Sequence, residues 1–255
     1  MANVVLSLLA HPDDAEFLCA GTLCRLVREH AWEAQIASMT SGDCGSPDLS
    51  PEEISRIRRA EGSKSAALLG GHYHCLEERD LLIFYCERSL ERVVRLVREV
   101  RPSIILTHSP ADYMLDHELT STLARAAAFG APIPNLFRDR GHAPPLDRIP
   151  HLYYCDPIEG KDLFGRPVAP GFAVDISGVL EAKAAMLAAH ASQREWLLKH
   201  HGMDQYVESM KRWAAQQGST HGVGFAEGFR QHLGHSYPQD NLLGRLLGAL
   251  PTAAA

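Results

Sequence analysis

Short apolar runs alternate with longer amphipathic segments through the first half of the chain, and this alternation constrains the fold most strongly. The runs are predicted strands at 4–9, 35–39, 73–76 and 104–107, and the segments between them are predicted helices at 17–30, 51–69 and 89–100. Strands that alternate with helices are typical of βαβ units with parallel strands. We therefore predict a Rossmann-like, doubly wound α/β fold whose mostly parallel sheet is flanked by helices.

The second half of the chain has a weaker pattern. Residues 130–150 contain five prolines and few apolar residues, which predicts a long loop that could act as a lid. Short strands are expected at 151–155 and 171–175 and a helix at 177–190, and we expect the part from 192 to 255 to be helical. A length of 255 residues suits one domain, so residues 1–255 are interpreted as a single unit.

Composition excludes several classes of function. A net charge of −6 without a Lys/Arg cluster argues against nucleic acid as a partner. No apolar run approaches the roughly 20 residues that cross a bilayer, so we expect no membrane insertion. The start of the chain has no basic leader and the six cysteines form no CxxC pair, which favours a cytoplasmic protein with free thiols. A homo-oligomer is the general expectation for such a protein.

Polar clusters follow two of the predicted strands. Residues 10–16 (AHPDDAE) come directly after the strand at 4–9, and residues 107–117 (THSPADYMLDH) come at the end of the strand at 104–107. In the doubly wound strand order 3-2-1-4-5 these two strands are neighbours, and the loops at their carboxyl ends part to form a crevice. The two clusters are therefore expected to converge on one site.

Two histidines and one carboxylate with an open fourth position are the ligand set of catalytic zinc. We assign His11, Asp14 and His117 as candidate ligands of one Zn²⁺ per chain, with another divalent ion as the alternative. Asp13 cannot easily face the same ion as its neighbour, which makes it the candidate general base. For either cluster alone, a helix-capping aspartate or a surface histidine would be the ordinary interpretation.

The two clusters resemble those of the LmbE-like, or PIG-L, zinc deacetylases that hydrolyse N-acetylglucosaminyl conjugates. Further matching features are spread over nearly the whole chain, and they are Thr40-Ser41-Gly42-Asp43, Arg58, Glu61, Leu69-Gly70, His190-Ala191-Ser192-Gln193 and Phe225-Ala226-Glu227-Gly228-Phe229. The resemblance implies the same doubly wound fold, with zinc held by His11, Asp14 and His117 and with Asp13 as base. It also implies that water activated by the metal attacks the amide carbonyl.

Three residues are candidates for binding substrate. The resemblance places Arg58 where an arginine can reach substrate, although a helix-surface arginine is the alternative. Asp43 lies in the turn after the second strand, where it could line the crevice or simply shape the turn. Tyr113 belongs to the second polar cluster.

The sequence departs from the family at one position. Many members have His-Pro-Asp-His in the second motif, and the first histidine helps to polarise the carbonyl or to stabilise the tetrahedral intermediate. Here Met114 takes that place, and a thioether donates no hydrogen bond. Candidates for the missing catalytic group are His108, Tyr113, His221, His232 and His235. We rank His235 first because it opens a polar loop after a predicted helix.

The resulting prediction is a zinc-dependent hydrolase that removes an N-acetyl group from an amino-sugar conjugate. Two alternatives remain: the same chemistry on another amide, as in a thiol-conjugate amidase or an antibiotic deacylase, and a non-catalytic, metal-dependent sugar-binding protein. A nucleotide-binding Rossmann protein is excluded, because the first loop lacks GxGxxG and its two carboxylates would repel a pyrophosphate.

Overall fold

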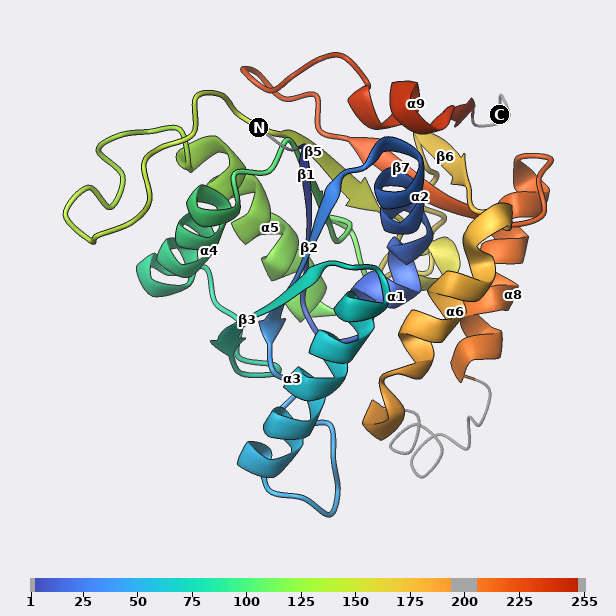
Figure 1. Cartoon of the computed structure of the whole chain (residues 1–255), viewed down its shortest axis with the longest axis horizontal. Coiled ribbons are helices and arrows are strands. Elements are labelled where there is room, and N and C mark those ends of the chain that lie inside the picture. The colour runs from blue at the N-terminus through green and yellow to red at the C-terminus, as the bar shows by residue number, and fades with distance from the viewer. Residues whose placement is uncertain (1–2, 194–205, 252–255) are drawn as a thin grey trace.

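A computed structural model describes residues 3–193 and 206–251. Its described strands join one sheet in the order β3-β2-β1-β4-β5-β7-β6-β8. Strands β1 to β5 run parallel, and β7, β6 and β8 continue the sheet antiparallel. The predicted doubly wound, mostly parallel fold is confirmed, including the adjacent placement of β1 and β4 (Figure 1).

The strands are β1 (Val4–Leu9), β2 (Glu33–Thr40), β3 (His72–Glu78), β4 (Ile104–Thr107), β5 (His151–Cys155), β6 (Phe172–Asp175), β7 (Ala226–Gln231) and β8 (Leu250–Pro251). The α-helices are α1 (Asp14–Leu18), α2 (Ala20–His30), α3 (Pro51–Leu68), α4 (Glu87–Val100), α5 (Leu115–Gly130), α6 (Leu180–Ala188), α8 (Tyr206–Thr220) and α9 (Leu242–Leu247). Two 3₁₀ turns lie at Ile158–Gly160 and Ser177–Val179. No helix within residues 3–193 and 206–251 is long and apolar enough to cross a membrane.

Helices cover both faces of the sheet, and each face has its own hydrophobic core. On one face α4 and α5 pack over β1, β4 and β5, with Val93, Val97 and Leu123 fully buried. On the other face lie α1, α2, α3 and α6, where Leu23 and Leu187 are fully buried (Figure 1). A parallel sheet that is buried on both sides needs strands that are apolar throughout. All six residues of β1 are buried, and five of them are apolar, with Ser7 the exception.

The helix predicted at 17–30 is divided into α1 and α2. Cys19 separates them with a non-helical φ of −142°. The break exposes the first amides of α2, and the Glu227 carboxylate accepts hydrogen bonds from the backbone N–H groups of Gly21 and Thr22 at 2.9 and 2.7 Å. A side chain at Gly21 would collide with Ile176. The division of the helix therefore creates a binding place for one carboxylate.

The prediction that residues 192–255 are helical is wrong in part. Residues 194–205 lie outside the described residues, but Ala226–Gln231 forms β7 and Leu250–Pro251 forms β8. β7 pairs with both β5 and β6, so it joins the parallel half of the sheet to the antiparallel half. Gly228 permits this packing, because a side chain there would overlap the Asp156 carboxylate.

The predicted long loop is present, since residues 131–150 contain no helix or strand. Arginines of α4 and its C-terminal cap hold it: Arg98 donates to the Ala131 carbonyl at 3.1 Å, and Arg101 donates to the Pro144 carbonyl at 3.2 Å. Arg140 of the loop pairs with Glu87 at 2.8 Å. These contacts tie the loop to α4 and do not bring it to the polar clusters, so the structure gives no support to a lid.

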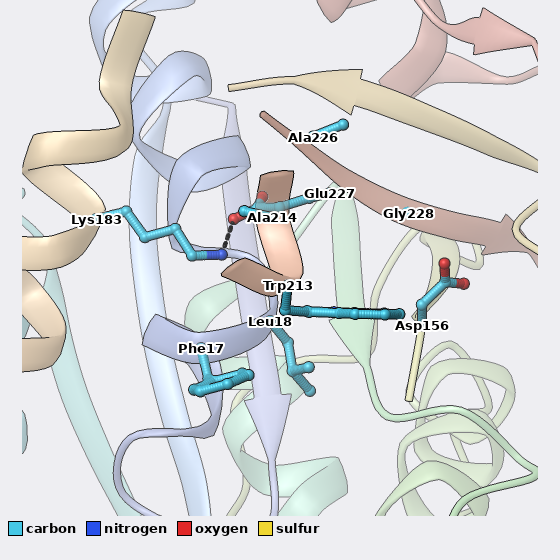
Figure 2. A pocket seen from close by; sticks show the side chains of 9 residues that line it. All are labelled: Phe17, Leu18, Asp156, Lys183, Trp213, Ala214, Ala226, Glu227 and Gly228. Atoms are coloured by element: carbon cyan, nitrogen blue, oxygen red, sulfur yellow. Dashed lines mark hydrogen bonds and ion pairs between the residues drawn. The ribbon is translucent and has the colours of Figure 1, made fainter. Parts of the chain in front are cut away.

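A buried ion pair joins the two halves of the chain. Lys183 on α6 lies 2.5 Å from Glu227 on β7, and both side chains are 2% exposed (Figure 2). Asp156 and Trp213 line the same small cavity. Because a charge buried without a partner is costly, each member of the pair depends on the other.

We expect Lys183→Met to lower the free energy of unfolding by about 3–5 kcal/mol, because it leaves the Glu227 carboxylate buried without its cation. Lys211→Met is the matched control, since Lys211 pairs with the exposed Glu181 at 3.0 Å, and it should cost less than about 1 kcal/mol. Urea denaturation measures both. Equal losses of unfolding free energy in the two variants would show that burial does not determine how much the Lys183–Glu227 pair stabilises the protein.

Candidate metal centre

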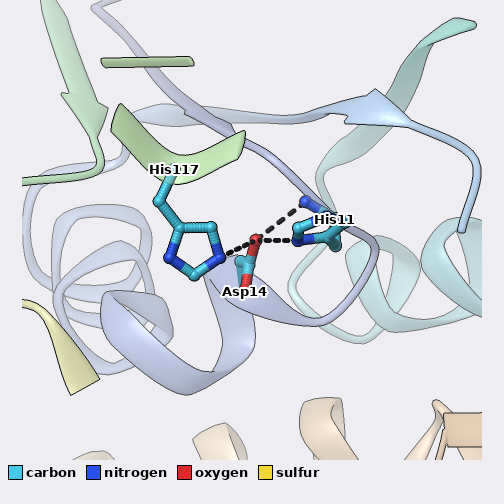
Figure 3. A group of neighbouring side chains, drawn as sticks. All are labelled: His11, Asp14 and His117. Atoms are coloured by element: carbon cyan, nitrogen blue, oxygen red, sulfur yellow. Dashed lines mark hydrogen bonds and ion pairs between the residues drawn. The ribbon is translucent and has the colours of Figure 1, made fainter. Parts of the chain in front are cut away.

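The two polar loops meet at the carboxyl edge of the sheet. β1 and β4 pair in parallel with Leu8 opposite Thr107, so the segments that follow them leave the sheet side by side. His11 and Asp14 come from the first loop and the start of α1, and His117 comes from the first turn of α5. Figure 3 shows the three side chains directed toward one another.

The spacing of the three groups fits a metal ion. Asp14 Oδ2 lies 3.3 Å from His11 Nδ1 and 3.7 Å from His117 Nε2. Ligands at roughly 2.0–2.1 Å from a tetrahedral Zn²⁺ are separated by roughly 3.4 Å. The donor atoms therefore already have about the separation that coordination requires.

Each histidine is oriented by a carboxylate on its other nitrogen. Asp116 lies 3.2 Å from His11 Nε2, and Asp112 lies 3.0 Å from His117 Nδ1. Such contacts fix the imidazole tautomer and leave the opposite nitrogen free to coordinate. Asp116 also accepts the Leu81 amide at 2.7 Å, so the loop after β3 helps to hold His11. This arrangement is typical of a metal centre.

The electrostatics of the cluster also favour a cation. Burial alone would lower the pKa of His11, but the carboxylates of Asp116 and Asp14 raise it to about 10. Asp14, Asp112 and Asp116 are each less than 10% exposed. A site that stabilises positive charge so strongly, with ligand-type atoms facing one another, is chemically suited to Zn²⁺ or another divalent ion.

Two other groups of side chains could hold a metal by their spacing, within the part of the chain that the structure describes. His108, Asp112 and His117 form one. In this group Asp112 already orients His117, while Nε2 of His108 accepts the Ala10 amide at 2.9 Å. His11, Asp14 and His117 are therefore the better candidates.

Asp43, Cys44 and Asp80 form the other group. There Asp43 already accepts hydrogen bonds from Arg79 at 2.8 Å and from the Asp80 amide at 2.7 Å. With both of its oxygens engaged, Asp43 is a poor metal ligand.

Asp13 contacts a different set of side chains from Asp14. Its φ of 108° lies in the left-handed half of backbone space, which is unfavourable for aspartate. Asp13 Oδ2 accepts a hydrogen bond from the Tyr206 hydroxyl at 2.5 Å and lies 3.8 Å from Arg58. Burial raises the pKa of Asp13 to about 6, against the opposing charge of Arg58. A carboxylate with such a pKa is suited to take up a proton near neutral pH.

Arg58 is buried in a space made by glycines. Side chains at Gly42 or Gly45 would collide with its guanidinium, and Gly42 has a φ of +75° that disfavours other residues. Arg58 donates to the Gly42 carbonyl at 3.4 Å and to the Gln193 side chain. The turn after β2 therefore holds the arginine that faces Asp13.

The other predicted site residues are Tyr113, Asp43 and His235, and they lie in different parts of the structure. Tyr113 is 57% exposed, with its ring edge-on to His117 at a centroid separation of 5.3 Å, so it lies beside the metal ligands. Asp43 is buried and connects the loops after β2 and β3. His235 is exposed in the segment between β7 and α9, and no described contact joins it to the cluster. The structure brings Tyr113 to the site and not His235.

Sequence reasoning missed two residues of the site. Asp112 stands inside the second polar cluster, and its position five residues before His117 could have suggested an orienting role. Tyr206 gave no signal, because it is 193 positions from Asp13. Residues 190–193 also lie near the site, where the Ser192 hydroxyl donates to Glu61 of α3 at 2.6 Å.

This chain is similar to known deacetylases. A family model described as PIG-L, GlcNAc-PI de-N-acetylase, matches residues 6–128, which include all three candidate ligands. Diacetylchitobiose deacetylase from Thermococcus kodakarensis is 27% identical over 238 residues, covering 89% of this chain and 82% of that protein.

Two solved structures show how widely the fold is shared. N,N′-diacetylchitobiose deacetylase from Pyrococcus horikoshii, bound to an inhibitor, is 26% identical with a TM-score of 0.76, covering 94% of this chain and 89% of that one. The 4-carboxy-2-hydroxymuconate hydratase GalB from Pseudomonas putida has a TM-score of 0.75 and covers 94% of this chain and 99% of its own. At 22% identity GalB shows the fold alone.

We expect Gly42→Ala to displace Arg58 and to destabilise the protein by about 1–2 kcal/mol, because alanine is strained at this φ and its methyl group would occupy the guanidinium's place. Gly178→Ala is the control, since nothing lies within 4 Å of a side chain there. Thermal unfolding compares the two variants. A Gly42→Ala protein as stable as the control would contradict the claim that Arg58 needs the space left by the glycine.

Proposed function

The chain belongs to the PIG-L family, and from this premise we propose that it is a Zn²⁺-dependent hydrolase that removes an N-acetyl group from an amino-sugar conjugate. The observation that carries the proposal is the division of labour between two adjacent carboxylates. Asp14 faces His11, His117 and the buried His108, whereas Asp13 is held by Arg58 and Tyr206. Metal-dependent binding needs only Asp14 and its histidines, but hydrolysis also needs a base such as Asp13.

The ligand set would be His11 Nδ1, Asp14 and His117 Nε2. When bound there, Zn²⁺ supplies an acidic water and a Lewis acid for the amide carbonyl. Asp112 and Asp116 keep the imidazoles in the orientation that leaves these nitrogens available. Zn²⁺ is favoured by the mixed nitrogen and oxygen donors, and another divalent ion would use the same atoms.

Asp13 is the proton carrier of the proposed reaction. Its carboxylate takes a proton from the attacking water and later returns that proton to the leaving amine. Arg58, 3.8 Å away, holds the carboxylate from one side and keeps it near the site. The raised pKa of Asp13, about 6, makes it a stronger base than an exposed aspartate while it remains ionised at neutral pH.

The amino-sugar substrate is proposed from the named relatives, two of which act on diacetylchitobiose. Tyr113 stands exposed beside His117 and offers a flat apolar face and a hydroxyl to a sugar ring. Met114 favours a second candidate of the same chemistry, an amidase for a different amide, because the residue that meets the tetrahedral intermediate in many family members is altered here.

The direct test is release of free amine from N-acetylglucosamine, its malate and inositol conjugates, and N,N′-diacetylchitobiose. Metal-free protein should be inactive, and added Zn²⁺ should restore turnover. Asp13→Asn should lower kcat by about 10²–10⁴-fold, because the base is lost while the ligands remain. Asp139→Asn, in the exposed loop that follows α5, is the matched control.

The outcomes separate the candidate functions. Turnover of another amide, with the same dependence on Zn²⁺ and Asp13, would support the second candidate and reject the amino sugar. Tight metal-dependent sugar binding without turnover, unchanged in Asp13→Asn, would contradict catalysis and identify a binding protein.

A further inference from the structure

Met114 stands where many members of the family have a histidine that donates a hydrogen bond. It occupies the N-cap position of α5 and is partly buried, three residues before His117. Its thioether cannot donate a hydrogen bond to the oxyanion that forms when water adds to an amide carbonyl. A hydrogen-bond donor near Asp13 would share that charge with the proposed metal ion.

Two further imidazoles lie near the site within the described residues. His108 stacks on His117 at 3.8 Å, and its Nε2 accepts the Ala10 amide. His190 lies 3.2 Å from Glu16. Both rings are buried, with His108 fully buried and His190 1% exposed, so neither is open to a substrate.

Tyr206 is the side chain that donates a hydrogen bond directly to the proposed base. The first residue of α8, it is partly buried and packs against Phe17 at a ring separation of 6.0 Å. Its hydroxyl donates to Asp13 Oδ2 at 2.5 Å, a charge-assisted hydrogen bond. Burial and the nearby Asp13 carboxylate raise the pKa of Tyr206, so the phenol keeps its proton. The hydroxyl is one hydrogen bond away from the group that must contact the attacking water.

We propose that the Tyr206 hydroxyl is a catalytic hydrogen-bond donor that turns from Asp13 to the substrate oxyanion, in place of the histidine that Met114 replaces. The inference rests on the proposed function. Before reaction the negative charge is on Asp13, which holds the phenol. Once Asp13 has taken the water's proton, the charge is on the carbonyl oxygen, and a neutral carboxyl group competes for the donor less strongly.

The proton balance of the step is simple. The water loses one proton to Asp13 as its oxygen bonds to the carbonyl carbon, and the carbonyl π electrons move to oxygen. Asp13 later gives that proton to the amine nitrogen as the C–N bond breaks. Tyr206 keeps its own proton throughout and stabilises charge only through a hydrogen bond.

Tyr206→Phe in the Zn²⁺-loaded protein tests the proposal, because it removes one oxygen and retains the ring that packs on Phe17. We expect kcat to fall by about 10²–10³-fold with little change in KM, the loss typical of one oxyanion donor. Tyr237→Phe is the matched control, since the Tyr237 hydroxyl donates to the Arg125 carbonyl, and it should leave kcat unchanged. Zn²⁺ affinity should be the same in all three proteins.

A second readout distinguishes donation to substrate from the mere positioning of Asp13. A methylphosphonamide analogue of the acetylated amino sugar, which is tetrahedral and anionic, should lose affinity for Tyr206→Phe by about the same factor as kcat/KM. The product amine should bind both proteins equally. If the analogue binds both equally while kcat falls, Tyr206 only positions Asp13 and the proposal is overturned.

The failure of the proposed function is recognisable separately. A wild-type protein that turns over no acetylated substrate contradicts that function, and the inference with it. An active wild type whose kcat survives Tyr206→Phe overturns only the inference. Restoration of kcat by Met114→His in the Tyr206→Phe background would support it further.

Discussion

The parallel pairing of β1 with β4 is the contact on which the site depends. It places two loops side by side at one edge of the sheet, and those loops carry Asp14 and His117. The same convergence gathers several carboxylates in a region sheltered from water, where like charges are costly unless a cation balances them. The raised pKa of His11 reflects that excess of negative charge. The fold thus gathers buried negative charge at a place where a divalent ion would balance it.

The C-terminal half of the chain supplies contacts to the site that the N-terminal half forms. β7 anchors the start of α2 through Glu227, Ser192 contacts Glu61 of α3, and Tyr206 at the start of α8 contacts Asp13. Asp13 itself is held in a strained backbone conformation that separates its side chain from that of Asp14. The proposed base and the proposed ligand can therefore be neighbours in sequence and still have different partners. The hydrophobic cores and the buried Lys183–Glu227 ion pair hold the surrounding helices and strands in place. A fixed surrounding structure keeps the side chains of Asp13 and Asp14 apart.

Sequence patterns predicted the parallel half of the fold because short, largely apolar strands such as β1 and β4 alternate there with longer amphipathic helices. They missed β7, since Ala226–Gln231 includes a glycine and two charged residues whose partners lie far away in the chain. The ligand candidates were accessible because strand ends concentrate function in such sheets. His235 lies outside the described contacts of the cluster, and its polar loop carried no sequence signal of which part of the fold it joins. Contacts such as Tyr206 with Asp13 become visible only in three dimensions.

Anomalous diffraction at the zinc absorption edge, from a crystal of Zn²⁺-loaded protein, would locate the metal ion. We expect one strong peak per chain between His11 Nδ1, Asp14 Oδ2 and His117 Nε2, with Asp13 outside coordination distance. A peak at His108 and Asp112, a peak at Asp43 and Asp80, or no peak within the cluster of His11, Asp14 and His117 would contradict that expectation.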